Sequence, residues 1–177
     1  MKRILFLLAM ILIGVNVSFA SNKKEKKDTE NMALYEQAVK AVQEKKFVVK
    51  FHTYDGPKRR LKVNNLTNFL MVDGNSTLRQ YDDGRRFWGY ANGGFPNYES
   101  PKMKEGYVSD VLVDIDKNGK VVCTLLYRTE GKPDSFTEIV FKKGSNKCTM
   151  KRHSRGLKSY SWGTIHPIGA TEIRKAI

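Results

Sequence analysis

The sequence has few of the residues from which catalytic and metal sites are built. Its 177 residues include only two cysteines and three histidines. The histidines, His52, His153 and His166, stand far apart and outside any His-x-x-x-His, Cys-x-x-Cys or Gly-x-Ser-x-Gly context. Cys148 and His153 could form a nucleophile pair, but five residues along one strand place them on opposite faces. We therefore expect no catalytic residue, no cofactor and no metal.

One acidic segment matches part of a calcium site. Asp114, Asp116, Asn118 and Gly119 have the spacing of the start of an EF-hand loop, in which alternating oxygens surround the ion. The glutamate that should end such a loop is replaced by Leu125, and the flanking residues have the pattern of strands rather than helices. We interpret the segment as a hairpin turn.

The chain also lacks an apolar run long enough to cross a membrane as a helix. The longest run, Ile4 to Val15, has 12 residues, whereas a spanning helix needs ~20. It follows Lys2 and Arg3 and precedes the small residues of a cleavage site at 18–20, which predicts a cleavable signal peptide over residues 1–20. The first cysteine is Cys123, too late to carry a lipid anchor. We expect a soluble, exported protein, periplasmic or extracellular, without a membrane anchor.

Acidic residues are scarce compared with basic ones. The chain has 18 Asp and Glu against 32 Lys and Arg, and without the predicted signal peptide 30 basic residues remain, a net charge near +12. Such a charge favours anionic partners. Export argues against nucleic acid and leaves an anionic glycan, a lipid headgroup or an acidic protein. The alternative is an ordinary solvated basic surface.

The remaining chain has the pattern of one domain over residues 32–177. Residues 21–31 are polar and Lys-rich without apolar periodicity, and we expect a flexible tether there. Apolar residues then recur at helical spacing and predict one amphipathic helix to about residue 45. The residues that define this face are Met32, Tyr35, Ala38, Val39 and Val42.

From Phe47 onward the apolar period changes to two and β-branched or aromatic residues dominate. Turn signals follow at regular intervals: Asp55-Gly56-Pro57, Asp73-Gly74-Asn75, Asn118-Gly119, Gly131-Lys132-Pro133 and Gly144-Ser145. We expect a mainly β fold, an antiparallel meander of about eight or nine strands curved toward a barrel or sandwich, with one N-terminal helix.

Side-chain chemistry fixes the register of two hairpins, because a slip of one residue would turn the apolar set toward water. A three-residue loop at residues 117–119 and a two-residue turn at residues 144–145 both give a coherent apolar face. The predicted pairs are Ile115 with Val121, Val113 with Cys123, Val111 with Leu125, Phe141 with Cys148, and Ile139 with Met150.

The same register bears on the two cysteines. If the strands at 120–128 and 136–142 are neighbours, Cys123 and Cys148 lie on either side of Phe141, two strand spacings or roughly 9 to 10 Å apart. A disulfide needs the α-carbons within about 7 Å. Two buried thiols are favoured, and a different strand order would favour a bridge instead.

Several segments together resemble a known family. They are Val108-Ser109-Asp110-Val111 to Lys117-Asn118-Gly119, then Phe141-Lys142-Lys143-Gly144-Ser145-Asn146-Lys147, and then Gly163 and Pro167. This combination is similar to the domain of unknown function 4251, whose members are small exported proteins of Bacteroides-type bacteria, and the resemblance covers about residues 32–170. It implies export and a fold, and it assigns no activity, cofactor or site residue.

The best candidate for a ligand site is the segment from Tyr81 to Tyr98. About 25 residues lie between strand regions ending near Tyr81 and starting near Tyr107, and loops of such length are usually functional or disordered. Exposed aromatic rings beside arginines could stack on sugars or hold an anionic group. The alternative is a lid whose rings close one end of the core. The candidate ligand-binding residues are Arg85, Arg86, Trp88, Tyr90, Phe95 and Tyr98.

Basic residues also gather in two other segments. Residues 142–158 carry seven Lys or Arg and no Asp or Glu, and residues 58–62 carry four more. Arg152 is unusual, because the alternation of side chains along a strand points it inward, in the same direction as Cys148 and Met150. Its charge must either reach water at an open end of the sheet or lie beside a carboxylate.

We therefore expect a binding domain for an anionic envelope component or a protein partner. Two alternatives stay open. A cell-envelope hydrolase would need two carboxylates, or a Cys–His pair, within hydrogen-bond reach. A structural or assembly factor would have no small-molecule ligand and no pocket beneath residues 82–106.

Overall fold

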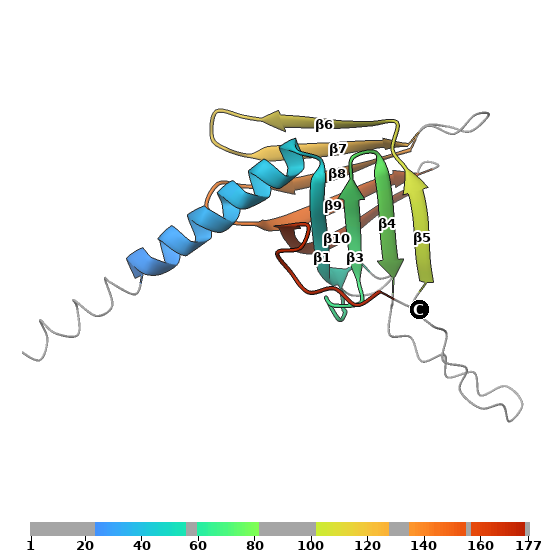
Figure 1. Cartoon of the computed structure of the whole chain (residues 1–177), viewed down its shortest axis with the longest axis horizontal. Coiled ribbons are helices and arrows are strands. Elements are labelled where there is room, and N and C mark those ends of the chain that lie inside the picture. The colour runs from blue at the N-terminus through green and yellow to red at the C-terminus, as the bar shows by residue number, and fades with distance from the viewer. Residues whose placement is uncertain (1–23, 56–59, 82–101, 128–134, 155–156, 176–177) are drawn as a thin grey trace, which may run out of the picture.

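The computed structural model describes residues 24–55, 60–81, 102–127, 135–154 and 157–175. These residues are mostly β, with one helix over residues 24–43 and ten strands. The strands form one antiparallel sheet that curls into a half-barrel (Figure 1). The helix precedes the first strand in the sequence and packs against the sheet. The expected fold class, a curved antiparallel sheet with one N-terminal helix, is confirmed.

The first and the last of the described strands lie side by side in the middle of the sheet. The strands are β1 (Lys46–Tyr54), β2 (Leu61–Lys62), β3 (Phe69–Asp73), β4 (Ser76–Tyr81), β5 (Lys102–Tyr107), β6 (Asp110–Ile115), β7 (Val121–Tyr127), β8 (Ser135–Phe141), β9 (Lys147–Ser154) and β10 (Leu157–Pro167). Nine follow the order β5-β4-β3-β1-β10-β9-β8-β7-β6, and β2 pairs with β1. In a simple meander each strand pairs with the next one along the chain. Here the consecutive strands β5 and β6 are not paired and form the two edges of the sheet, whereas β1 and β10 pair in its middle.

The helix covers the concave side of the sheet through an apolar face. Ala38, Ala41 and Val42 are almost fully buried, and the Tyr35 hydroxyl donates a hydrogen bond of 2.9 Å to the Gly119 carbonyl. Residues 24–31, expected as a tether, already belong to the helix, although 24–30 are exposed. The apolar pattern did not predict the first turns of the helix, because exposed Lys and Glu favour a helix through intrinsic propensity rather than through burial.

The concave face carries the core. Alternate residues of each strand point inward and pack against the helix, among them Phe47, Phe51, Leu125, Ile139, Phe141 and Ile165. All five predicted hairpin pairs are present. Gly119 and Gly144 have φ of 73° and 77°, the left-handed conformation that these turns require. Local turn chemistry therefore set both registers correctly.

The two cysteines are free and buried on either side of β8. Cys148 pairs with Phe141 as predicted, but Cys123 pairs with Ile139, because Val121 rather than Cys123 lies opposite Phe141. Burial raises the pKa of each thiol to about 12. The preference for two thiols over a disulfide is confirmed.

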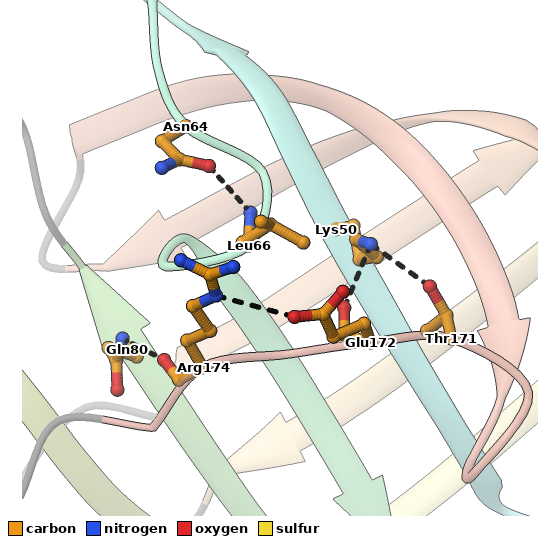
Figure 2. Close-up of polar contacts among 7 residues, drawn as sticks. All are labelled: Lys50, Asn64, Leu66, Gln80, Thr171, Glu172 and Arg174. Carbon is orange, nitrogen blue, oxygen red and sulfur yellow. Dashed lines mark hydrogen bonds and ion pairs between the residues drawn. The ribbon is translucent and has the colours of Figure 1, made fainter.

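On the convex face, the C-terminal segment 168–175 crosses β1, β3 and β4 (Figure 2). The Lys50 ammonium, on a side chain only 8 % exposed, donates to Thr171 Oγ1 at 3.0 Å and to the Glu172 carbonyl at 2.9 Å. Gln80 Nε2 donates to the Arg174 carbonyl at 2.8 Å, and the Arg174 amide donates to the Leu66 carbonyl at 2.8 Å. We call this segment the C-terminal strap.

In the part of the chain that the structure describes, no helix has both the length and the apolar character needed to cross a membrane.

The buried thiols give a first prediction. A thiol-specific disulfide reagent at about pH 8 should leave Cys123 and Cys148 unmodified in the folded protein, because only the thiolate reacts and burial keeps both protonated. Both should react after denaturation in guanidinium chloride. Lys147→Cys is the control, since its side chain is exposed beside Cys148 and should react at once. Modification of the folded parent protein at the control rate would contradict the buried placement.

The strap gives a second prediction. Lys50→Met should lower the free energy of unfolding by ~1–3 kcal/mol, because the Thr171 hydroxyl and the Glu172 carbonyl lose their donor in two part-buried hydrogen bonds. Hydrogen exchange of the Arg174 amide should accelerate as the strap loosens. Lys46→Met removes a neighbouring lysine that is exposed and should change stability by less than about 0.5 kcal/mol. Unchanged exchange at Arg174 in Lys50→Met would show that Lys50 does not hold the strap.

Candidate functional site

The concave face changes character along its length. Near the helix it is apolar, whereas its other end carries polar and aromatic side chains from β1, β4, β7, β8, β9 and β10. These are Tyr54, Arg79, Tyr81, Tyr127, Thr137, Arg152 and Ser161, all at register positions that face inward. We call this group the concave polar end.

Arg79 is the central residue of the concave polar end. It lies on β4 between Leu70 of β3 and Lys104 of β5, and its guanidinium carbon is 5.9 Å from the centre of the Tyr81 ring. Its Nε is sealed from solvent and has no hydrogen-bond partner among the described residues. Burial, as the largest cause, and the charge of Arg152 both lower the pKa of Arg79. An arginine nevertheless keeps its charge in a protein.

Arg152 faces the same space from β9, where it pairs with Thr137 of β8 and Ser159 of β10. Its side chain is exposed, so of the two environments considered for it, the open end of the sheet is the one observed. The two arginines are close enough for the Arg152 charge to disfavour the Arg79 charge. Two like charges therefore face the same side of the sheet.

Tyrosines surround these charges. The Tyr54 and Tyr81 rings lie 4.8 Å apart between centres, and the Tyr54 hydroxyl donates to Asn68 Oδ1 at 3.2 Å. Burial raises the pKa of Tyr127 although a hydrogen bond from Thr137 and the charges of Arg79 and Arg152 oppose that shift. The rings and hydroxyls provide an apolar lining with polar tips.

Acidic residues are missing from this side of the described strands. No inward position of β1 or β3 to β10 holds an Asp or Glu. Glu138, on β8, faces outward, 3.4 Å from the Lys151 ammonium and 3.3 Å from His153 Nε2. The charges of Arg79 and Arg152 therefore have no carboxylate partner among the described residues, which is an arrangement suited to an anion.

The predicted ligand-binding residues Arg85, Arg86, Trp88, Tyr90, Phe95 and Tyr98 lie outside the described residues. The described residues on either side of them, Tyr81 and Lys102, are paired across β4 and β5. The strand expected to start near Tyr107 instead begins at Lys102 and ends at Tyr107.

Sequence reasoning identified Arg152 as unusual but missed Arg79. The Asp73-Gly74-Asn75 turn could have revealed it. A two-residue turn there pairs Val72 with Thr77 and Leu70 with Arg79, which places the arginine on the face of the buried leucine.

Two other candidates are resolved by the structure. Asp116 Oδ1 accepts hydrogen bonds from the amides of Asn118 at 2.8 Å and Lys120 at 2.9 Å, so its carboxylate organises the predicted hairpin turn. No cluster of three or more metal-ligating side chains occurs in the described part of the chain. Cys148 is a protonated core thiol, and His153, on the outer face, stacks on Phe136 at 4.1 Å.

No family model and no curated protein matches the sequence. Among solved structures, the chain is similar to the crystal structure of a DUF4251 family protein from Bacteroides eggerthii, with a TM-score of 0.60 and 19 % sequence identity. The similarity covers 81 % of this chain and 94 % of that chain. The resemblance noted in the sequence is thereby confirmed at the level of the fold.

The uncompensated charge of Arg79 gives a third prediction. Arg79→Met should raise the free energy of unfolding by about 1 kcal/mol, because it removes an unpartnered buried donor and the repulsion from Arg152. Arg79→Lys keeps the charge and should bring no such gain. Chemical denaturation of both variants would measure the difference. A methionine variant that is clearly less stable than the parent would show that Arg79 has a structural partner.

Proposed function

We propose that this protein is a binding domain that holds an anionic group at the concave polar end, with Arg79 and Arg152 as its charged partners. The observation that carries the proposal is the sealed Nε of Arg79, which has no partner among the described residues and no carboxylate facing it. An anion would supply the missing acceptor for this donor. It would also relieve the repulsion between the two arginines.

The energetics support binding more than a structural role. Sealing a guanidinium Nε from solvent without an acceptor costs free energy, and proteins that do so usually have a functional reason. A ligand that brings a carboxylate, sulfate or phosphate converts this cost into affinity, since charge-assisted hydrogen bonds in a desolvated site are strong. The Tyr54 and Tyr81 rings add apolar contact beside the charges.

The ligand class follows from the predicted export. The signal-peptide pattern over residues 1–20 supports a place outside the cytoplasm, where the anions within reach belong to glycans, lipid headgroups or acidic proteins. A hydrolase is less well supported. The Cys148 thiol has a pKa of about 12 and faces away from His153, and no carboxylate of the described strands faces the concave polar end.

The fourth prediction tests this site by nuclear magnetic resonance. Sulfate, phosphate and a heparin hexasaccharide are titrated at constant ionic strength while the Nε–Hε resonance of Arg79 is followed. At least one probe should shift that resonance to saturation, because the bound anion accepts its hydrogen bond. Arg79→Gln and Arg152→Gln should weaken binding by about tenfold or more, equivalent to ~1.4 kcal/mol.

Arg174→Gln is the matched control, because it removes one arginine charge from the opposite face of the sheet. Its affinity should equal that of the parent protein. The proposal is wrong if none of the three probes shifts Arg79 more than chloride does. It is equally wrong if Arg174→Gln and Arg79→Gln lose affinity to the same extent, since that pattern reports only net charge.

A further inference from the structure

A separate groove of 500 Å³ lies where β8, β9 and β10 meet the irregular part of β1. Val140, Thr149 and Trp162 line it from neighbouring strands, and they are direct cross-strand partners. Their side chains point to the opposite side of the sheet from those of the core residues Ile139, Cys148 and Met150, so the groove is on the convex face. We call it the convex groove.

A β-bulge shapes one wall of the convex groove. The pairing of β1 with β10 shifts between Phe51 and Thr53, which leaves His52 unpaired and directed at the groove. Gly163 of β10 permits the close approach of β1 at the bulge, because a β-carbon at this position would collide with the backbone carbonyl of Lys50. Bulges often reorient a side chain next to a functional site.

Aromatic and cationic groups define what the groove can hold. The exposed Lys142 and Lys147 line the groove. The Arg60 guanidinium, which does not line it, lies over the Trp162 ring at 3.9 Å from its centre. No acidic residue lines it. A ligand that fits would have an apolar face for the indole and a negative charge for the lysines.

Neutral hydrogen-bonding groups complete the lining. Burial, followed by the charges of Lys50 and Lys147, lowers the pKa of His52, so the imidazole is neutral near pH 7. Its Nδ1 accepts from Asn65 Nδ2 at 3.3 Å, which places the ring proton on Nε2, 3.4 Å from Thr164 Oγ1. Both ring nitrogens of His52 are thereby engaged. Thr164 Oγ1, which also bonds His166 Nε2 at 2.9 Å, keeps one lone pair, so Thr149 and Thr164 can bond hydroxyls of one ligand.

We propose that the convex groove binds a uronic-acid unit of an acidic glycan. The sugar ring would pack on Trp162 and Val140, its carboxylate would lie between Lys142 and Lys147, and its hydroxyls would bond Thr149 and Thr164. A polyhydroxylated anion with one apolar face uses every kind of group in the groove. This proposal does not depend on the site at the concave polar end, which is formed by different residues on the opposite face.

The fifth prediction compares tetragalacturonate with its full methyl ester, which keeps the rings and removes the charge. Tetragalacturonate should shift the Trp162 indole N–H resonance to saturation and raise the pKa of His52, because the bound carboxylate stabilises the imidazolium. The ester should bind about tenfold more weakly or worse. Calorimetry gives the dissociation constants.

The variants separate this site from general charge attraction. Lys142→Gln with Lys147→Gln should lose about tenfold in affinity or more, whereas Lys26→Gln with Lys27→Gln, on the exposed start of the helix, should lose little. Arg79→Gln should bind tetragalacturonate like the parent protein. The proposal is overturned if Trp162 does not shift, if both lysine pairs lose affinity equally, or if Arg79→Gln abolishes binding.

Discussion

The antiparallel pairing of β1 with β10 is the interaction on which the rest of this structure depends. It joins the half made of β3, β4 and β5 to the half made of β6 to β9, which have no other hydrogen-bonded connection in the described sheet. It also builds both candidate sites, because it sets Tyr54 beside Ser161 on the concave face and His52 near Trp162 on the convex face. A change in this register would disturb the two sites together.

The two sites illustrate how one sheet can carry independent chemistry on its two faces. Side chains alternate along a strand, so β9 provides Arg152 to the concave polar end and Thr149 to the convex groove. The core between them needs only the inward residues near the helix, which leaves the far end of the concave face free for polar groups. The core and the two candidate sites therefore draw on different parts of the same strands.

Sequence reasoning succeeded where structure is local. The turns at Gly119 and Gly144 fix their hairpins within a few residues, so parity and burial followed directly. The pairing of β1 with β10 joins segments more than a hundred residues apart, and apolar alternation alone does not choose between partners of similar pattern. Arg79 was missed for a related reason, since its inward direction follows only once the β3–β4 register is worked out, and the predicted loop residues lie outside the described chain.

The central position of β1 also has a consequence for how the protein is made. Of the described strands, β1 is synthesised first and its partner β10 last, and the strap that covers β1 follows β10. Until β10 and the strap have emerged, β1 keeps one bare edge and Lys50 lacks its acceptors on Thr171 and Glu172. A product that stops short of β10 would therefore leave one edge of its central strand unpaired and open to recognition by proteases and chaperones.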